Sequence, residues 1–541
     1  MGVGMARANT TISWLVSGVS LALLSSMVMA AGPNTTTVRQ VITGLSPFPC
    51  APTSNTATSH PILNSEVEPD LDVALNPASP LSPPIVVAAW QQDRYTRAGG
   101  ANDIYMRVSM DGGATFGSMI PMRNVSCFGG PFERSSDPRV TISSNGIIYF
   151  VGLGFDHATD PNAVSIARYD LATQSFIDLT ELNAVKGIAQ PTATDFSKLT
   201  VEPNDPSGNT LYLTWDRYFQ GSYFTGNPHV LSDRGKLYFS KSLDGATWSQ
   251  PKPIFNTYTG LASQYAPDVQ VSGAHIVLVN NSKTDQFSRL VDLMGVQTGL
   301  VNPDVSPHNF TEVVTSDNQG TTWSKPSVVN PDGLVGTAVN PEHYDASQDF
   351  ITNHSNSQVI RSGDAVDQAD VDRTRNLIYS VIQEHSLIYD HTPCRIDLYV
   401  SKDGGTSWTL IGPVNRVLST QAFNQGIAVL NDGRIAISYY DFRNHQAGSS
   451  TLETDRWLDI YSYDPASDTL TFQNEVRLTA TSFDYLKAPA LGGTAISPAG
   501  LFLGDYQTMK SFNGVIYSVF GITTDDPNNK SDILFTITTD P

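Results

Sequence analysis

The sequence predicts an all-β protein built from repeated hairpins, and three observations support this prediction. Short apolar runs punctuated by Gly, Pro, Asn and Asp recur along the 541 residues, whereas helical periodicity is hard to find. A Ser-x-Asp turn that ends in Gly-x-x-Trp, or a close variant of it, occurs at residues 109–116, 242–248, 316–323 and 401–408. Each copy follows a strand-like run, so each turn is expected to close a β-hairpin.

The chemistry of these four turns is local. Ser and Asp side chains can hydrogen-bond backbone amides, Gly supplies a positive φ, and the closing aromatic ring packs back over the hairpin. Two copies are imperfect, since the second lacks one residue before Gly245 and the third has Asn318 in place of Asp. Two further hairpins, near Asp170 and Asp464, are interpreted as eroded forms of the same turn.

From about Glu66 to the end, this pattern resembles the Asp-box, or BNR, repeat of the sialidase (neuraminidase) superfamily. The resemblance implies a β-propeller whose Asp boxes lie on the face opposite the active centre. It is specific for the fold and much less so for activity, because Asp boxes also occur in propellers without catalysis.

A second repeated feature, a short strand led by Pro or Asp, precedes the hairpins and gives seven first strands. We therefore predict a seven-bladed β-propeller. The last unit ends after its third strand at residues 532–538, so the segment 36–43, with a strand at 37–42, is expected to close the ring and cover the open sheet edge. A six-bladed sialidase propeller is the alternative.

The N-terminus predicts export. An apolar stretch over residues 12–29 precedes Ala30, which favours a signal peptide over 1–30 followed by a single propeller domain over 31–541. A membrane anchor is the alternative interpretation of this stretch. We expect a secreted, extracellular or periplasmic protein, monomeric and free of the membrane after cleavage. Cys50, Cys127 and Cys394 allow one disulfide, whose pairing the sequence leaves open.

The formal net charge is -20, with 32 Lys and Arg against 52 Asp and Glu. This balance argues against nucleic acid as a partner, because phosphate binding needs clustered cations. No Cys/His spacing resembles a zinc site.

Functional residues are expected at the ends of second strands and the starts of first strands, which share one face of a propeller. Three second strands end in similar pairs, Asp93 and Arg94, Asp216 and Arg217, and Asp441 and Arg443. The resemblance implies an Arg triad that holds a substrate carboxylate, and these three guanidinium groups are the candidates. The alternative is that each Asp–Arg pair braces neighbouring loops. Glu133, Arg134 and Glu384 are expected to line the same pocket.

The starts of the first strands carry acidic residues: Asp70, Asp137, Asp268, Asp370 and Asp505. They are predicted to surround the central axis, where like charges raise one another's pKa or demand a cation. Ca²⁺ held by these carboxylates is one interpretation and solvation by channel water is another; no cofactor is required. This acidity departs from the sialidase pattern, since Val67 stands where the superfamily has an Arg of its triad.

The resemblance further implies a Tyr nucleophile activated by a carboxylate, with a second carboxylic acid as proton donor. Tyr506 is the candidate nucleophile, Glu68 or Asp505 its base, and Asp103 the acid/base residue; a structural role is the alternative for each. The sequence therefore predicts a secreted, sialidase-like propeller that acts on glycans as an exo-glycosidase. The alternatives are a non-catalytic carbohydrate- or protein-binding propeller and a calcium-dependent polysaccharide-active enzyme.

Overall fold

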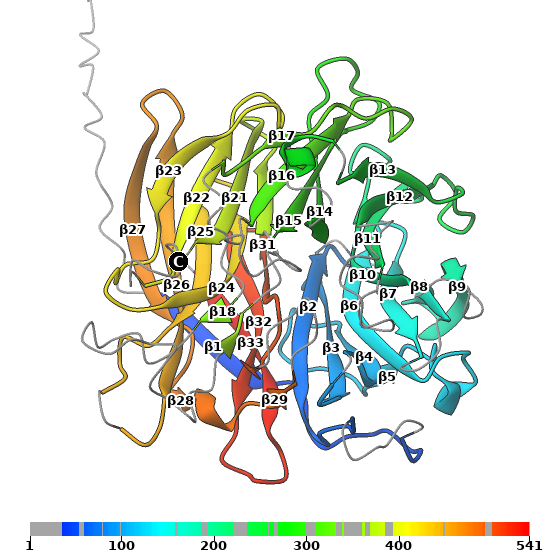
Figure 1. Ribbon diagram of the computed structural model, residues 1–541, viewed down its shortest axis with the longest axis vertical. Coiled ribbons are helices and arrows are strands. Elements are labelled where there is room, and N and C mark those ends of the chain that lie inside the picture. The colour runs from blue at the N-terminus through cyan, green and yellow to red at the C-terminus, as the bar shows by residue number, and fades with distance from the viewer. Residues whose placement is uncertain are drawn as a thin grey trace, which may run out of the picture.

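The structure is a computed structural model (Figure 1). It describes residues 35–52, 59–77, 79, 81–97, 99–156, 161–185, 192–219, 235–257, 259–264, 269–298, 309–331, 338–339, 360–362, 368–384, 393–446, 449–492, 500–539 and 541. These residues form sheets whose strand pairs are antiparallel except for one short parallel pair, Ile360 with Leu501. They also form three short 3-10 helices at Ser126–Phe128, Leu261–Gln264 and Tyr485–Lys487. The predicted all-β class is confirmed. The predicted signal peptide lies outside the described residues, and no helix among those residues is long and apolar enough to cross a bilayer.

The chain forms its sheets in sequence order. The first contains β2 (Glu66–Ala74), β3 (Ile85–Arg94), β4 (Ala101–Ser109) and β5 (Ile120–Pro121), and the second contains β6 (Arg134–Ile142), β7 (Ile147–Phe155), β8 (Asn162–Asp170) and β9 (Ser175–Val185). The next two contain β10 (Thr192–Val201), β11 (Leu211–Phe219), β12 (Lys236–Ser242) and β13 (Lys252–Asn256), then β14 (Val269–Val279), β15 (Arg289–Thr298), β16 (Phe310–Ser316) and β17 (Ser327–Val328). A single residue pair, Ala101 with Ser135, links the first two sheets.

Three more large sheets and one small sheet follow. They contain β20 (Gln368–Asp372), β21 (Leu377–Glu384), β22 (Arg395–Ser401) and β23 (Thr409–Pro413); β24 (Ala422–Val429), β25 (Ile435–Asp441), β26 (Glu453–Asp464) and β27 (Thr469–Arg477), with β28 (Phe483–Asp484) on β26; and β31 (Thr508–Phe512), β32 (Val515–Thr523), β33 (Ser531–Thr539) and β1 (Thr36–Val41). The small sheet contains β18 (Ala338–Val339), β19 (Ile360–Arg361), β30 (Gly500–Leu501) and β29 (Ala490–Leu491). In the last large sheet the N-terminal strand β1 is antiparallel to β33, with Thr37 opposite Thr538.

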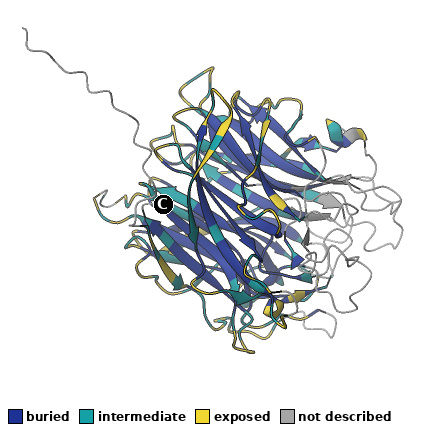
Figure 2. Cartoon of the chain, turned by 90° about the vertical axis from the view of Figure 1, so that its left-hand side faces the viewer, coloured by how far each residue is buried: buried dark blue, intermediate teal, exposed yellow. Residues whose placement is uncertain are grey.

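The first strand of each large sheet contacts the first strand of the next. These contacts run from β2 through β6, β10, β14, β20 and β24 to β31, and β31 contacts β2. In Figure 1, β2 and β31 accordingly lie near the middle of the molecule, while β9 and β27 lie at its sides. The strands are mostly buried, and exposed residues gather in the connecting loops (Figure 2).

A β-bulge occurs at the same place in five of these first strands. The register shifts lie between Val67 and Asp70, Ser136 and Arg139, Asp195 and Lys198, Ser272 and His275, and Phe423 and Gly426. Inside each bulge one residue has a positive φ: Glu68, Asp137, Phe196, Gly273 or Asn424. Because a bulge bends its strand and re-aims side chains, the repeat sets which side chains reach the middle of the molecule.

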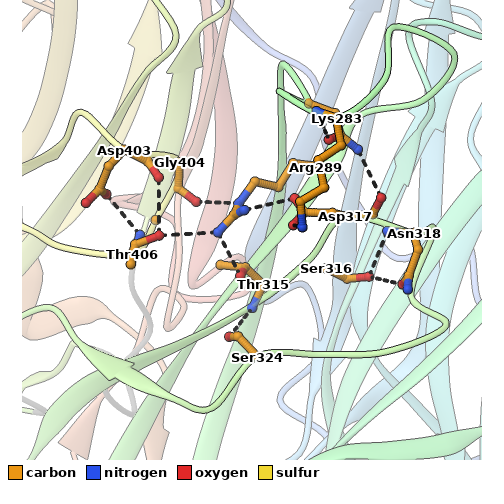
Figure 3. Close-up of polar contacts among 12 residues, drawn as sticks. Lys283, Arg289, Thr315, Ser316, Asp317, Asn318, Ser324, Asp403, Gly404 and Thr406 are labelled. Carbon is orange, nitrogen blue, oxygen red and sulfur yellow. Dashed lines mark hydrogen bonds and ion pairs between the residues drawn. The ribbon is translucent and has the colours of Figure 1, made fainter.

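In all four serine–aspartate turns the Asp or Asn side chain accepts backbone N–H groups, and in all but the second the Ser does so as well. In the third turn, the Gly320 N–H donates to Ser316 Oγ at 3.0 Å, and the Thr322 N–H donates to Asn318 Oδ1 at 2.9 Å. Arg289 ties this hairpin to the next one, because it pairs with Asp317 at 2.8 Å and donates from Nε to the Gly404 carbonyl at 2.8 Å (Figure 3). These turns therefore brace neighbouring sheets.

A disulfide joins Cys50 to Cys127, and the third cysteine, Cys394, is buried and lies outside this bond. The bond fastens the segment after β1 to the 3-10 helix at Ser126–Phe128, where Phe48 meets Phe128 edge to face with ring centroids 5.9 Å apart.

Candidate functional site

Five side chains from three neighbouring sheets form one buried group, which we call the axial cluster: Glu68, Asp137, Arg139, Asp505 and Tyr506. Glu68 and Asp137 occupy the bulges of β2 and β6, and Asp505 and Tyr506 precede β31. Each is at most 5% exposed. Their charges act on one another, because Asp137 and Asp505 both influence the ionisation of Glu68.

Glu68 is at the centre of the cluster. Its Oε2 accepts a hydrogen bond from Gln91, and its Oε1 accepts the Asp505 N–H at 3.4 Å. Burial, followed by the charges of Asp137 and Asp505, raises the pKa of Glu68 well above its usual range. Gly504 permits this close packing, because a Cβ there would lie 2.8 Å from the Glu68 nitrogen.

Tyr506 lies beside Glu68 and under a cation. The Arg139 guanidinium carbon is 3.4 Å from the centroid of the Tyr506 ring, and Arg139 Nε donates to the Ser197 carbonyl at 3.0 Å. Within the described part of the chain, the Tyr506 hydroxyl has no hydrogen-bond partner. Burial raises the pKa of Tyr506 well above its usual range, and the positive charge of Arg139 opposes that rise.

Two further arginines flank the cluster. Arg361 donates from Nε to Asp505 Oδ1 at 2.9 Å and from Nη2 to Oδ2, so the pair is bidentate. Arg94 donates from Nη1 to Gln91 Oε1 at 3.0 Å. Both guanidinium carbons lie near the Phe502 ring, at 4.8 Å for Arg361 and 5.2 Å for Arg94.

Below the cluster, the acidic ring predicted from the sequence is a ring of mixed charge. Asp70 Oδ1 lies 3.9 Å from both Arg139 Nη1 and Lys198 Nζ. Asp70 also accepts the Val140 N–H at 2.9 Å, so it joins β2 to the next first strand. Two other aspartates link successive first strands in the same way. Asp137 of β6 accepts the Phe196 N–H of β10, and Asp370 of β20 accepts the Val429 N–H of β24.

The repeat register explains this difference from the prediction. The prediction aligned the first strands by their aspartates, which makes Asp70 equivalent to Asp137. The bulges instead place Glu68 at the position of Asp137. They place Asp70 at the position of Arg139 and Lys198, so acidic and basic residues share one level. A Pro follows both Glu68 and Asp137, and this shared dipeptide pattern could have shown from the sequence that the two positions are equivalent.

Metal binding by these carboxylates was predicted from their expected proximity. Among the described residues, no group of three or more His, Cys, Asp or Glu side chains could hold a metal ion. Asp268, one of the predicted ligands, lies outside the described residues.

Two of the three predicted arginines, Arg94 and Arg443, contact different partners. Arg443 pairs with Asp441 at 2.5 Å and with Glu475 of the outer strand β27 at 2.6 Å. Arg94 instead contacts Gln91 beside the axial cluster. Arg217 lies opposite Thr194 and Lys236 in the third sheet, next to the buried Asp216.

The other predicted site residues contact groups outside the axial cluster. Asp103 accepts the Ile104 N–H at 2.8 Å, and burial raises the pKa of this carboxyl well above its usual range. Asp93 accepts the Asn64 N–H at 2.8 Å. Arg134 donates to the carbonyls of Arg97 and Gly99, and the Glu133 N–H donates to Asp156.

Glu384 belongs to a separate buried group in the β20–β23 sheet. It accepts a hydrogen bond from the Tyr399 hydroxyl and lies 3.3 Å from Arg395, which also pairs with Asp397 at 2.9 Å. Burial, followed by the neighbouring Asp397, raises the pKa of Glu384 to about 8.

The sequence matches no protein-family model and no curated protein. Similar solved structures include a protein of unknown function from Dyadobacter fermentans, at 15% identity over 75% of this chain and 94% of that one, with a TM-score of 0.42. A mutant of the α-L-arabinofuranosidase Arb93A from Fusarium graminearum is 10% identical over 78% and 98% of the two chains, with a TM-score of 0.41. A mutant of the NanB sialidase from Streptococcus pneumoniae is 12% identical over 88% and 68%, with a TM-score of 0.41.

Proposed function

We propose that the axial cluster is the active centre of a secreted glycoside hydrolase of the sialidase type. The observation that carries the proposal is the Tyr506 hydroxyl, which has no hydrogen-bond partner in the described part of the chain. Three carboxyl groups and the Arg139 guanidinium act on its ionisation. A buried hydroxyl left unpaired costs stability. Beside Tyr506, Glu68 could accept the hydroxyl proton and Arg139 could stabilise the phenolate, and this combination supports a role in reaction.

The cluster supplies the groups that a Tyr-based retaining mechanism needs. Glu68 is the base, because the raised pKa of its carboxyl makes its carboxylate a stronger proton acceptor than an exposed Glu. Arg139 over the ring stabilises the phenolate that forms when Tyr506 loses its proton. We assign the second carboxyl group to Asp137 in place of Asp103, since the hydrogen bond of Asp103 to Ile104 lies outside the cluster.

The test is hydrolysis of fluorogenic glycosides, with a sialoside first. Tyr506→Phe and Glu68→Gln should each lower kcat/KM by about a hundredfold or more, the usual contribution of a nucleophile or general base. Tyr105→Phe is the matched control, because it also removes a buried hydroxyl without a hydrogen-bond partner in the described residues. Absence of hydrolysis across the panel, or equal activity of Tyr506→Phe and Tyr105→Phe, would refute the proposal.

A non-catalytic glycan-binding protein is the second candidate, and the burial of the cluster favours it. Tyr506 is 1% exposed and Asp505 is already paired with Arg361, so a substrate has little access to either side chain. Glycan binding on an array without hydrolysis would establish this candidate.

We also propose that the large sheets are the seven blades of one closed propeller. The contacts between successive first strands, and the pairing of β1 with β33, support this arrangement. Export through the predicted signal peptide is a further proposal, supported by the Cys50–Cys127 disulfide, since such bonds persist in oxidising compartments.

A further inference from the structure

A cavity of about 370 Å³ lies between the first strands, beyond the axial cluster. Its lining includes Asp72, Lys198, His275, Asp370 and Lys510. Asp72 is four residues beyond Glu68 along β2, on the order of 13 Å at a strand's usual rise per residue. The cavity is therefore separate from the proposed catalytic groups.

Two ammonium groups in the cavity lining, those of Lys198 and Lys510, have no hydrogen-bond acceptor among the described residues. Among the described residues, Lys510 has no hydrogen bond and no ion pair within 4 Å, although the charges of Asp72 and Asp370 act on it. The ion pair of Lys198 is with Asp70 Oδ1 at 3.9 Å, too long for a hydrogen bond. Each lysine therefore has N–H donors to offer a ligand.

The carboxylates in the lining already accept hydrogen bonds from the backbone. Asp72 accepts the Ile142 N–H at 2.8 Å, and Asp370 accepts the N–H groups of Val371 and Val429, both at 2.8 Å. His275 Nε2 lies 3.0 Å from the Ala369 carbonyl. The lysines are thus the charged lining groups whose hydrogen-bonding capacity is least used.

Lys510 also disfavours the charged form of Lys198, whereas Asp72, Asp370 and Asp70 favour the charged form of Lys510. Burial lowers the pKa of Lys198 to about 8, and the positive charges of Arg139 and Lys510 contribute to that fall. An anion between the two ammonium groups would supply acceptors and relieve this repulsion.

We propose that this cavity binds a small oxyanion, a carboxylate or a phosphate group, between Lys198 and Lys510. The proposal does not rest on the proposed hydrolase activity, because it gives neither lysine a catalytic role, although Lys198 and Arg139 of the axial cluster both lie 3.9 Å from Asp70 Oδ1.

Calorimetric titration with inorganic phosphate, and separately with acetate, tests the proposal at constant ionic strength set with NaCl. We expect at least one of the two anions to bind saturably. The anion that binds more tightly identifies whether the site prefers a phosphate or a carboxylate group. Lys510→Gln and Lys198→Gln should each weaken binding about tenfold or more, the effect of losing one charge-assisted hydrogen bond. Lys510→Arg should retain most of the affinity.

Lys325→Gln is the matched control, because it removes an exposed lysine from the surface. Circular dichroism establishes that each variant is folded before titration, and the two glutamine variants give independent tests if one fails to fold. Absence of binding by the unsubstituted protein, or affinity unchanged in both glutamine variants, would overturn the proposal.

Discussion

Asp70→Asn tests whether the axial carboxylates hold neighbouring sheets together. Asp70 accepts the Val140 N–H of β6 at 2.9 Å and the Thr508 hydroxyl of β31 at 2.9 Å, and it lies 3.9 Å from Arg139 and Lys198. One carboxylate thus contacts three sheets besides its own strand. Its side chain is 2% exposed, so solvent screens these interactions little.

The expected cost follows from those contacts. Removing one partner of a buried ion pair costs about 3–5 kcal/mol. Asp70 Oδ1 lies 3.9 Å from both Arg139 Nη1 and Lys198 Nζ, a long separation, so we expect a cost of about 3 kcal/mol here. Asn keeps one acceptor oxygen, so one of the two hydrogen bonds from Val140 and Thr508 is lost at about 1 kcal/mol. We expect the free energy of unfolding to fall by about 3–4 kcal/mol in total.

Guanidinium denaturation followed by fluorescence measures this loss, with Asp178→Asn as control. Asp178 pairs with Arg168 at the surface with its side chain 40% exposed, so its substitution should cost about 1 kcal/mol or less. If Asp70→Asn costs no more than Asp178→Asn, the axial carboxylates do not hold the sheets.

The same contacts predict a pH dependence. Burial alone would raise the pKa of Asp70, but Lys198, Arg139 and the hydrogen bonds outweigh it and lower the pKa. The contribution of Asp70 is therefore complete above about pH 4, the pKa of an unfolded Asp, and is lost as the pH falls through the lower folded pKa. The stability difference between the unsubstituted protein and Asp70→Asn should shrink below pH 4.

Three further predictions concern other parts of the fold. Gly320→Ala should lower the free energy of unfolding by about 2–4 kcal/mol, because its Cβ would lie 2.3 Å from the Phe239 ring. Gly514 has a similar φ but open space around it, so Gly514→Ala should cost only about 1 kcal/mol. Equal losses in denaturation experiments would contradict a packing role for Gly320. The Cys50–Cys127 disulfide closes a loop of 77 residues and so restricts the unfolded chain. Its reduction should lower the free energy of unfolding by up to about 4.5 kcal/mol. An unchanged Tm in dithiothreitol would count against this stabilising role. The Glu384 carboxyl stabilises the fold most below about pH 4.3, the pKa of an unfolded Glu, and this contribution is lost as the pH rises to about 8. Over this range Glu384→Gln should therefore lose less stability than the unsubstituted protein. Parallel stability profiles of the two proteins would contradict a raised pKa of Glu384.

The local parts of this fold could be predicted from the sequence because their causes are local. The Ser316 turn needs only its own Ser, Asn and Gly to form its hydrogen bonds, and the strand before it needs only alternating apolar residues. The strand at residues 37–42 was predicted because the last unit lacked a strand, and it pairs with β33. Glu68, Asp505 and Tyr506 were predicted because they stand at strand starts.

The charges at the axis could not be predicted in the same way, because a bulge shifts the register of one strand against another. The sequence shows acidic residues at the first strands, but which of them share a level depends on where each bulge lies. Arg361 is 144 residues from Asp505 in the sequence, and nothing local to either residue indicates their ion pair.

We could predict the β-hairpins, the positions of their turns and the acidic and tyrosine side chains that open the first strands, since these features depend on interactions within a few residues. Tertiary packing places Arg139, Lys198 and Lys510 among those acids, and it gives Arg443 and Arg94 different partners. Charge pairing between strands depends on sheet register and on the order of sheets around the axis, and both are set by packing across the whole chain.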